Sequence, residues 1–259
     1  MTVFAAIALA ATGLLGAAAA TPAMAQGDSR QVAKLVTFGG ACVKCDLAGR
    51  KLTGARFFGA NFTGAILTGS DLRGASFEGA NFSGADLSHT DLRGAEMSGA
   101  RFVTANFSGA ALAGVEASGT DMMQANLAGA NLMSGEISGA DLARVSAAGA
   151  IFDHATLVGT NLTAGHFPHA SFHGADLTAA NLSGSDFPAA DFAGAVLTGA
   201  RLAGADLSAA RNLTQAQLNL TCAGVGARLP RGLTARPCHG AHAPPEPPRQ
   251  PSPPAPREP

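Results

Sequence analysis

The chain of 259 residues has no Trp and no Tyr, and its only aromatic residues are 14 Phe. Charged residues make up 14% of it, and the formal net charge is −1. This balance provides no bulk electrostatic attraction to nucleic acid or to an anionic membrane. Nearly all large apolar residues are Leu or Phe at regular positions, unlike the varied, interdigitated core of an ordinary globular domain. The composition favours a fold of stacked, similar layers.

Residue sets that carry catalysis are also missing from the sequence. No Ser or Cys nucleophile is placed with a His and an acid in the pattern of a hydrolase, and no Gly-rich phosphate loop precedes a helix. We therefore expect no enzymatic activity and no cofactor.

The segment 1–25 has the pattern of a secretory signal peptide. An apolar stretch from Val3 to Ala20 is followed by Pro22 and then by Ala23-Met24-Ala25, a small-x-small cleavage pattern. Cleavage after Ala25 predicts a periplasmic or secreted protein. The segment before the apolar stretch has no Lys or Arg, and about 18 apolar residues could also span a bilayer as an uncleaved anchor.

Residues 45–209 form an unbroken array of 33 five-residue units. The central residue of each unit, from Leu47 to Leu207, is Leu in 17 units, Phe in 11, Met in two, Ile in one and Ala in two. The residue two before it is mostly Ala, and the residue two after it is mostly Gly. Positions two apart in an extended segment share a face, so the small and large residues point inward and the polar residue between them points outward. Units this short bury nothing alone and must stack.

The length of one coil follows from where Phe recurs. Phe centres lie four units apart six times, three units apart three times and never two units apart, although five pairs also lie in adjacent units. Asn pairs share the four-unit spacing and would form stacked amide ladders; they are Asn61/Asn81, Asn106/Asn126 and Asn161/Asn181. Four units per coil is the better interpretation. Coils about 4.8 Å apart predict a rod about 40 Å long.

Units such as Ala60-Asn61-Phe62-Thr63-Gly64 resemble the pentapeptide repeat family over about 165 residues. The resemblance implies an all-β fold, a right-handed quadrilateral β-helix. We expect residues 26–44 to cap its N-terminal end, with the first coil beginning in Cys42-Val43-Lys44-Cys45. Residues 210–238 resemble the C-terminal cap of exported family members, and residues 239–259, of which nine are Pro, are expected to form a disordered tail.

The C-terminal cap is expected to contain a short helix. Thr214 fits the N-cap position, with Gln217 three residues later as its reciprocal partner, and Leu213 and Leu218 fit a hydrophobic staple. Gly224 is expected to end this helix.

Four cysteines, Cys42, Cys45, Cys222 and Cys238, could suggest a zinc site. The fold places the two pairs at opposite ends of the rod, too far apart for one metal ion. In an oxidising compartment their even number favours structural disulfides, Cys222–Cys238 and Cys42–Cys45. We therefore expect no metal. Four neighbouring histidines, among which His154 could approach His173 across coils, are treated as surface residues; they are His154, His166, His169 and His173.

The outward positions point to one recognition surface. Glu96, Glu116 and Glu136 follow one another at intervals of four units and should stack on one face. Two interpretations stay open, a tolerated solvated column and a recognition face for a basic partner. The array has 15 acidic and eight basic residues, whereas residues 210–238 have four Arg and no acid.

We therefore expect a non-catalytic exported scaffold for a protein or cell-envelope partner, of unknown oligomeric state, with no nucleic acid bound and no membrane span after cleavage. The alternative, which the family resemblance implies, is a DNA mimic that binds a type II topoisomerase; an exported protein would not meet that enzyme.

Overall fold

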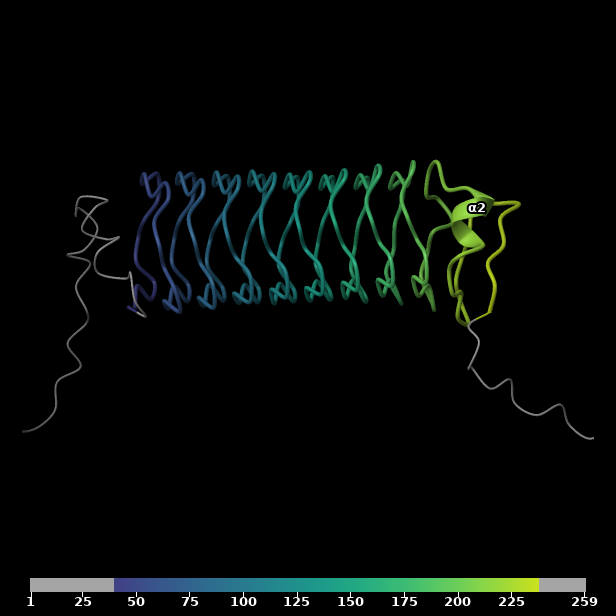
Figure 1. The fold of residues 1–259 in the computed structure, drawn as a ribbon, viewed down its shortest axis with the longest axis horizontal. Coiled ribbons are helices and arrows are strands. Elements are labelled where there is room, and N and C mark those ends of the chain that lie inside the picture. Colours follow the sequence, from purple (N-terminus) through teal and green to yellow (C-terminus); the bar gives the residue numbers. More distant parts are fainter. Residues whose placement is uncertain (1–39, 238–259) are drawn as a thin grey trace, which may run out of the picture.

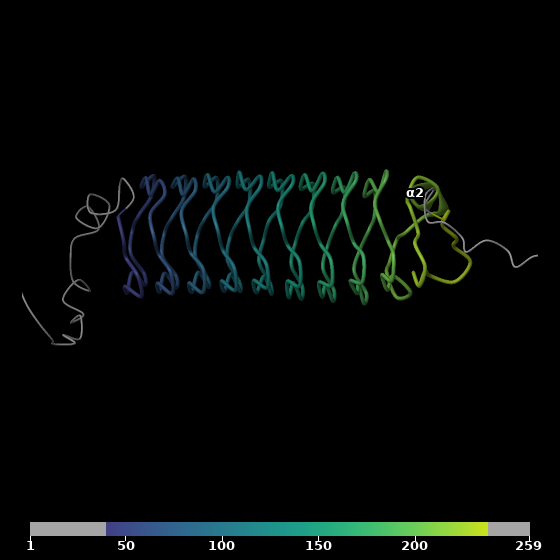
Figure 2. The same cartoon turned by 90° about the horizontal axis from the view of Figure 1, so that it is seen from below.

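The structure, a computed structural model, describes residues 40–237. Within this range the chain winds into coils that stack along one axis, and the C-terminal segment lies at one end of the stack (Figure 1). A view at right angles shows the same stack (Figure 2). The expected signal peptide (1–25), most of the N-terminal cap, Cys238 and the Pro-rich tail (239–259) lie outside the described residues.

Adjacent coils are joined by parallel β-bridges with a constant register of four units. A bridge occurs at every fifth residue, from Ala41↔Asn61 to Asp191↔Arg211. In a representative pair of coils, the Phe62 N–H donates to the Asn81 carbonyl (2.7 Å), and the Asn81 N–H donates to the Ala60 carbonyl (2.9 Å). The coil length predicted from the Phe spacing is confirmed. The bridges begin at Ala41, four residues before the array boundary expected at residue 45, because Cys42 already pairs with Asn61.

The inward positions form one continuous core. Every central residue from Leu47 to Leu207 is at most 3% exposed, and the small residue two positions before it is buried in almost every unit. The two Ala centres, Ala117 and Ala147, are as buried as the larger ones. The inward assignment made from the five-residue frame is therefore confirmed.

Phenylalanines in this core stack on phenylalanines of the next coil. All six pairs that lie four units apart have ring centroids 4.6–5.5 Å apart and nearly parallel planes. The five pairs in adjacent units meet edge to face within one coil. Offset-stacked and edge-to-face pairs are the favourable arrangements of aromatic rings. The two spacings in the sequence thus correspond to two different contacts.

Each unit ends in a tight turn. In one such turn the Ala65 N–H donates to the Phe62 carbonyl (2.9 Å), and Gly64 has a φ of 64°. Gly adopts this left-handed conformation without the steric cost that a Cβ adds. Ten units of the array have another residue in this conformation, for example Ala179 with a φ of 57°.

At the C-terminal end, helix α2 (Gln215–Leu218) covers the last complete coils (Figure 1). Its N-cap is Thr214, and the predicted capping box with Gln217 is present. Leu218 is fully buried and Leu213 packs against the core. The prediction that the helix runs to Gly224 is wrong: α2 is a single turn with its C-cap at Asn219. Cys222 already bridges Arg201, which requires an extended backbone.

Candidate functional site

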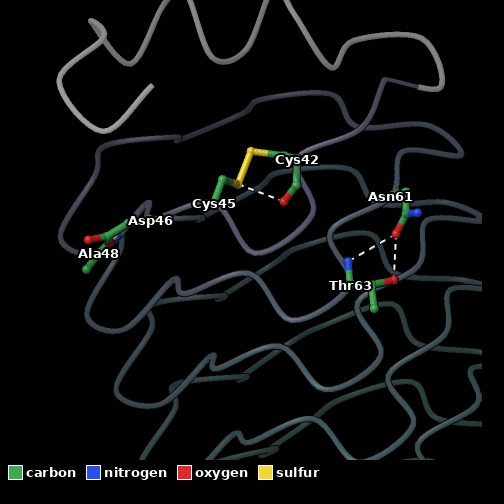
Figure 3. The surroundings of a disulfide bond; sticks show 6 residues. All are labelled: Cys42, Cys45, Asp46, Ala48, Asn61 and Thr63. Carbon is green, nitrogen blue, oxygen red and sulfur yellow. Dashed lines mark hydrogen bonds between the residues drawn. A yellow bond between two sulfur atoms is a disulfide. The ribbon is translucent and has the colours of Figure 1, made fainter. Parts of the chain in front are cut away.

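Asp and Asn at the outward position of a unit bind the turn that follows them. In Asn61, the side-chain oxygen accepts hydrogen bonds from the Thr63 N–H (3.0 Å) and the Thr63 hydroxyl (2.6 Å), as Figure 3 shows. This is the local side-chain-to-backbone bond that makes Asp and Asn favourable in turns.

The same bond, to the N–H of the residue two positions later, recurs in all four columns of outward residues. Sixteen residues make it: Asp46, Asn61, Asp71, Asn81, Asp86, Asp91, Asn106, Asp121, Asn126, Asn131, Asp141, Asn161, Asp176, Asn181, Asp191 and Asp206. Their carboxylates and amides are therefore partly satisfied within their own unit.

Three glutamates differ from this rule and form what we name the glutamate column: Glu96, Glu116 and Glu136. They are joined by consecutive bridges, Glu96↔Glu116 and Glu116↔Glu136, so they stack about 4.8 Å apart. All three are exposed. Within residues 40–237 none of the three carboxylates has a hydrogen-bond or ion-pair partner. The bridges confirm the predicted stacking of these three residues.

A serine follows each glutamate at the turn. Glu96-Met97-Ser98-Gly99, Glu116-Ala117-Ser118-Gly119 and Glu136-Ile137-Ser138-Gly139 repeat the same Glu-x-Ser-Gly pattern in three consecutive coils. In the described part of the chain, the N–H and hydroxyl groups of these serines have no hydrogen-bond partner. The residue-by-residue interpretation of the sequence missed these serines, although the recurrence of Glu-x-Ser at every fourth unit could have identified them. In the described part of the chain, glutamate carboxylates that can accept hydrogen bonds therefore lie near serine N–H and hydroxyl groups that can donate them, and neither set has a partner.

Elsewhere on the surface, carboxylates are paired with arginines. Arg73 donates to both carboxylate oxygens of Asp71 (2.8 and 2.7 Å), and Arg93 does the same to Asp91 (2.8 and 2.6 Å). Arg73 also lies 3.7 Å from Asp91 and so links the two pairs. The hydrogen bond from Arg73 holds the pKa of Asp71 well below its usual range. The hydrogen bond from Arg93 likewise lowers the pKa of Asp91. The negative charges of Asp71 and Asp91 are therefore already balanced by arginines.

One of the three predicted amide ladders is hydrogen-bonded. Asn126 donates to Asn106 (3.1 Å), which in turn donates to Asp86 (3.1 Å). Burial raises the pKa of Asp86, but hydrogen bonds from Ser88, Thr68 and Asn106 outweigh it, so that the pKa is lowered. Asn61 and Asn81 bridge each other through the backbone, but the Asn61 side-chain oxygen is occupied by its own Thr63. The side chains therefore do not always repeat the register of the backbone.

The cysteines lie at the two ends of the stack. Cys42 and Cys45 form a disulfide in the first coil and pack against the core (Figure 3). Cys222, in the last coil, is disulfide-bonded, and its expected partner Cys238 lies outside the described residues. No group of three or more His, Cys, Asp or Glu side chains in residues 40–237 could hold a metal ion.

The histidines do not gather into one cluster. His154 and His173 meet edge to face across adjacent coils, with ring centroids 5.4 Å apart, as their spacing allowed. His166 instead pairs with Asp186 (2.5 Å), and His169 occupies a turn with a φ of 58°. No helix in the described range is long and apolar enough to cross a membrane.

Comparison with known proteins places this architecture in a family. The family model for pentapeptide repeats matches the chain in 8 copies, over residues 42–79, 70–109, 105–134, 136–164, 157–192 and 186–222. No curated protein matches the chain in a sequence search.

Several solved structures are similar to the chain. One is HetL, a pentapeptide repeat protein involved in heterocyst differentiation regulation in the cyanobacterium Nostoc sp. strain PCC 7120. It is 27% identical, with 73% of this chain and 85% of that chain covered and a TM-score of 0.38. A pentapeptide repeat protein from the Arabidopsis thaliana thylakoid lumen is 30% identical over 46% of this chain and 70% of that chain, with a TM-score of 0.28. Full-length QnrB1, a plasmid-mediated fluoroquinolone resistance protein, is 17% identical over 72% and 94%, with a TM-score of 0.34.

The family model covers more than half of the chain. Pentapeptide repeat proteins fold as right-handed β-helices and are generally non-enzymatic structural or binding proteins. This chain belongs to the pentapeptide repeat family.

Proposed function

We propose that the chain is an exported, non-catalytic binding scaffold, a right-handed β-helix of quadrilateral cross-section. Its glutamate column, Glu96, Glu116 and Glu136, recognises a basic protein or a basic component of the cell envelope. The observation that carries the proposal is that these three stacked carboxylates have no partner among the described residues, whereas most other outward acids bond to their own turn or to an arginine.

The rigidity of the column supports a recognition role. The backbone of each glutamate is held by two bonds to the preceding coil; the Glu116 N–H donates to the Ala95 carbonyl (3.0 Å), and its carbonyl accepts from the Met97 N–H (2.6 Å). Because the backbone at these positions is already ordered, only side-chain entropy is lost when a partner binds, which favours affinity. Their mutual repulsion in the free protein is relieved by a cationic partner.

The location of the protein distinguishes the proposal from its alternative, a DNA mimic that binds a type II topoisomerase. We expect cell fractionation to recover the protein outside the cytoplasm, with an N-terminus at Gln26. A full-length product confined to the cytoplasm would contradict the exported scaffold and leave the topoisomerase hypothesis open.

The recognition face is tested by comparing two triple variants with the same change in net charge. The first carries Glu96→Gln, Glu116→Gln and Glu136→Gln. The second, as a control, carries Asp46→Asn, Asp141→Asn and Asp176→Asn, three acids whose side chains bond to their own turns. In pull-downs from envelope extracts, we expect the glutamate variant to lose the partner that wild type and control recover. Equal recovery by both variants would dismiss the glutamate column.

A further inference from the structure

The C-terminal cap, residues 210–237, has a charge opposite to that of the array it covers. It contains Arg211, Arg228, Arg231 and Arg236 and no Asp or Glu, whereas the array, residues 45–209, contains 15 acidic and eight basic residues. All four arginine side chains are exposed. Of the four, Arg228 has an ion pair, a 3.4 Å contact with Asp206. The cap is therefore a positively charged end of the molecule, as is the opposite end, where residues 40–60 contain Lys44, Arg50, Lys51 and Arg56 against one acid, Asp46.

These arginines lie on different sides of the last coil. Arg211 bridges Asp191, Arg228 bridges Asp206, and the Arg236 carbonyl accepts the Ala223 N–H beside Cys222. These contacts continue three different columns of the array. A partner that bound one side of the rod would meet only some of these charges. A flat partner lying across the end can reach arginines from more than one side.

The cap also carries the two most exposed large apolar side chains of the described residues. Val225 is 94% exposed and Leu220 is 59% exposed. Their carbonyls accept from Gly204 and Gly199, so they occupy successive corners of the last coil on either side of Cys222. A surface that has both cationic side chains and exposed aliphatic side chains is typical of proteins that enter the headgroup region of a membrane. Figures 1 and 2 show that this region ends the rod, with no further coil of the described chain beyond it.

We propose that the C-terminal end of the rod docks on an anionic phospholipid surface, with the arginines at the lipid phosphates and with Leu220 and Val225 between the headgroups. A membrane fits these observations better than an acidic protein does, because the arginines lie on several sides of the end and the two apolar groups are highly exposed at its corners. The proposal concerns a part of the molecule separate from the glutamate column. A negative result for membrane docking would not affect the proposed role of the glutamate column, and the reverse also holds.

Vesicle flotation with the purified full protein tests the proposal. We expect binding to vesicles that contain phosphatidylglycerol and none to pure phosphatidylcholine, with binding falling as salt increases because exposed charges are screened. A variant with Arg211→Gln, Arg231→Gln and Arg236→Gln should bind about 100-fold more weakly. The matched control carries Lys51→Gln, Arg56→Gln and Arg144→Gln, three cations far from the cap, and should bind as wild type does.

A second pair of variants tests the apolar contact. Leu220→Ser with Val225→Ser should weaken flotation, whereas Ile66→Ser with Val196→Ser, at array positions that are both 43% exposed, should not. An unchanged thermal midpoint would show that each variant is folded. The proposal is overturned if wild type does not float with phosphatidylglycerol vesicles, or if both arginine triples behave alike. It is also overturned if the cap arginines instead support self-association, seen by sedimentation, without flotation.

Discussion

The inward and outward sides of each repeat differ in how their side chains find partners. Inward residues pack on inward residues one coil away, in several cases of the same kind, as Phe172 does between Phe152 and Phe192. Outward Asp and Asn mostly bond within their own unit, as Asp176 does with Thr178. Stability between coils therefore comes mainly from the core and the backbone, and the outward side chains are free to vary. The glutamate column uses this freedom, because one extra methylene leaves its carboxylates without a turn to bind.

The largest effect is expected on the inward side. Phe172→Ala removes a fully buried ring with two stacked neighbours, at centroid distances of 5.0 and 5.1 Å, and should lower the free energy of unfolding by about 3–5 kcal/mol. The outward control, Val196→Ala, should change it by less than about 0.5 kcal/mol. Urea unfolding measures both, and similar losses for the two variants would contradict the division between the two sides.

A smaller effect is expected where an outward acid bonds to its own turn. Asp176→Ala removes the acceptor for the Thr178 N–H (2.9 Å) and hydroxyl (2.5 Å) and should destabilise the protein by about 1 kcal/mol. Asp176→Asn keeps an acceptor oxygen at the same place and should be nearly neutral. If the Ala and Asn variants unfold at the same urea concentration, the turn bond is not what Asp176 contributes.

The ion pair of Arg73 and Asp71 should contribute less, and in a pH-dependent way. The pKa of Asp71 in the folded protein is lowered by its hydrogen bond with Arg73, so the stabilisation is complete above the pKa of an unfolded Asp, about 4. It is lost as the pH falls below that value. Arg73→Gln should therefore lower the thermal midpoint slightly at neutral pH and progressively less in acid. Arg144→Gln, at an exposed position, should show no such pH dependence; a constant difference for Arg73→Gln would exclude the linkage.

The smallest effect on stability, and the sharpest test of the outward rule, is Glu116→Asp. The shorter side chain can accept the Ser118 N–H, as Asp at this position does in other units, and should stabilise the protein by about 0.5 kcal/mol. The same change also brings the carboxylate closer to the backbone, so that it extends less far toward a binding partner. If Glu116→Asp gives no more stability than Glu116→Gln, the extra methylene of Glu does not explain why the column is unpaired.

The sequence was sufficient to predict the coil, because the residues that determine the coil recur at regular intervals. Phe pairs four units apart can be recognised without a structure, since only stacked coils bring them together, and the five-residue frame assigns Leu47 to Leu207 to the core. Helix α2 was predicted from its capping box, but its end at Leu218 was not, because the pairing of Cys222 with Arg201 depends on tertiary structure.

The candidate site could be predicted only in part. The stacking of Glu96, Glu116 and Glu136 followed from their spacing. Asp and Asn at equivalent positions bond to the N–H two residues later, whereas Glu does not. This difference depends on the length of the side chain, and the spacing of residues in the sequence does not reveal it. For the same reason the ladder at Asn61 and Asn81 is absent, since Thr63 occupies the acceptor oxygen of Asn61.

The most direct test of the central claim is the affinity of the protein for a defined basic probe, a pentalysine peptide, measured by calorimetry at low salt. We expect Glu96→Gln, Glu116→Gln and Glu136→Gln together to weaken binding by at least about 10-fold. Asp46→Asn, Asp141→Asn and Asp176→Asn, with the same loss of charge, should leave it within about twofold. Equal losses in the two triple variants would contradict recognition by the glutamate column, because binding would then follow net charge alone.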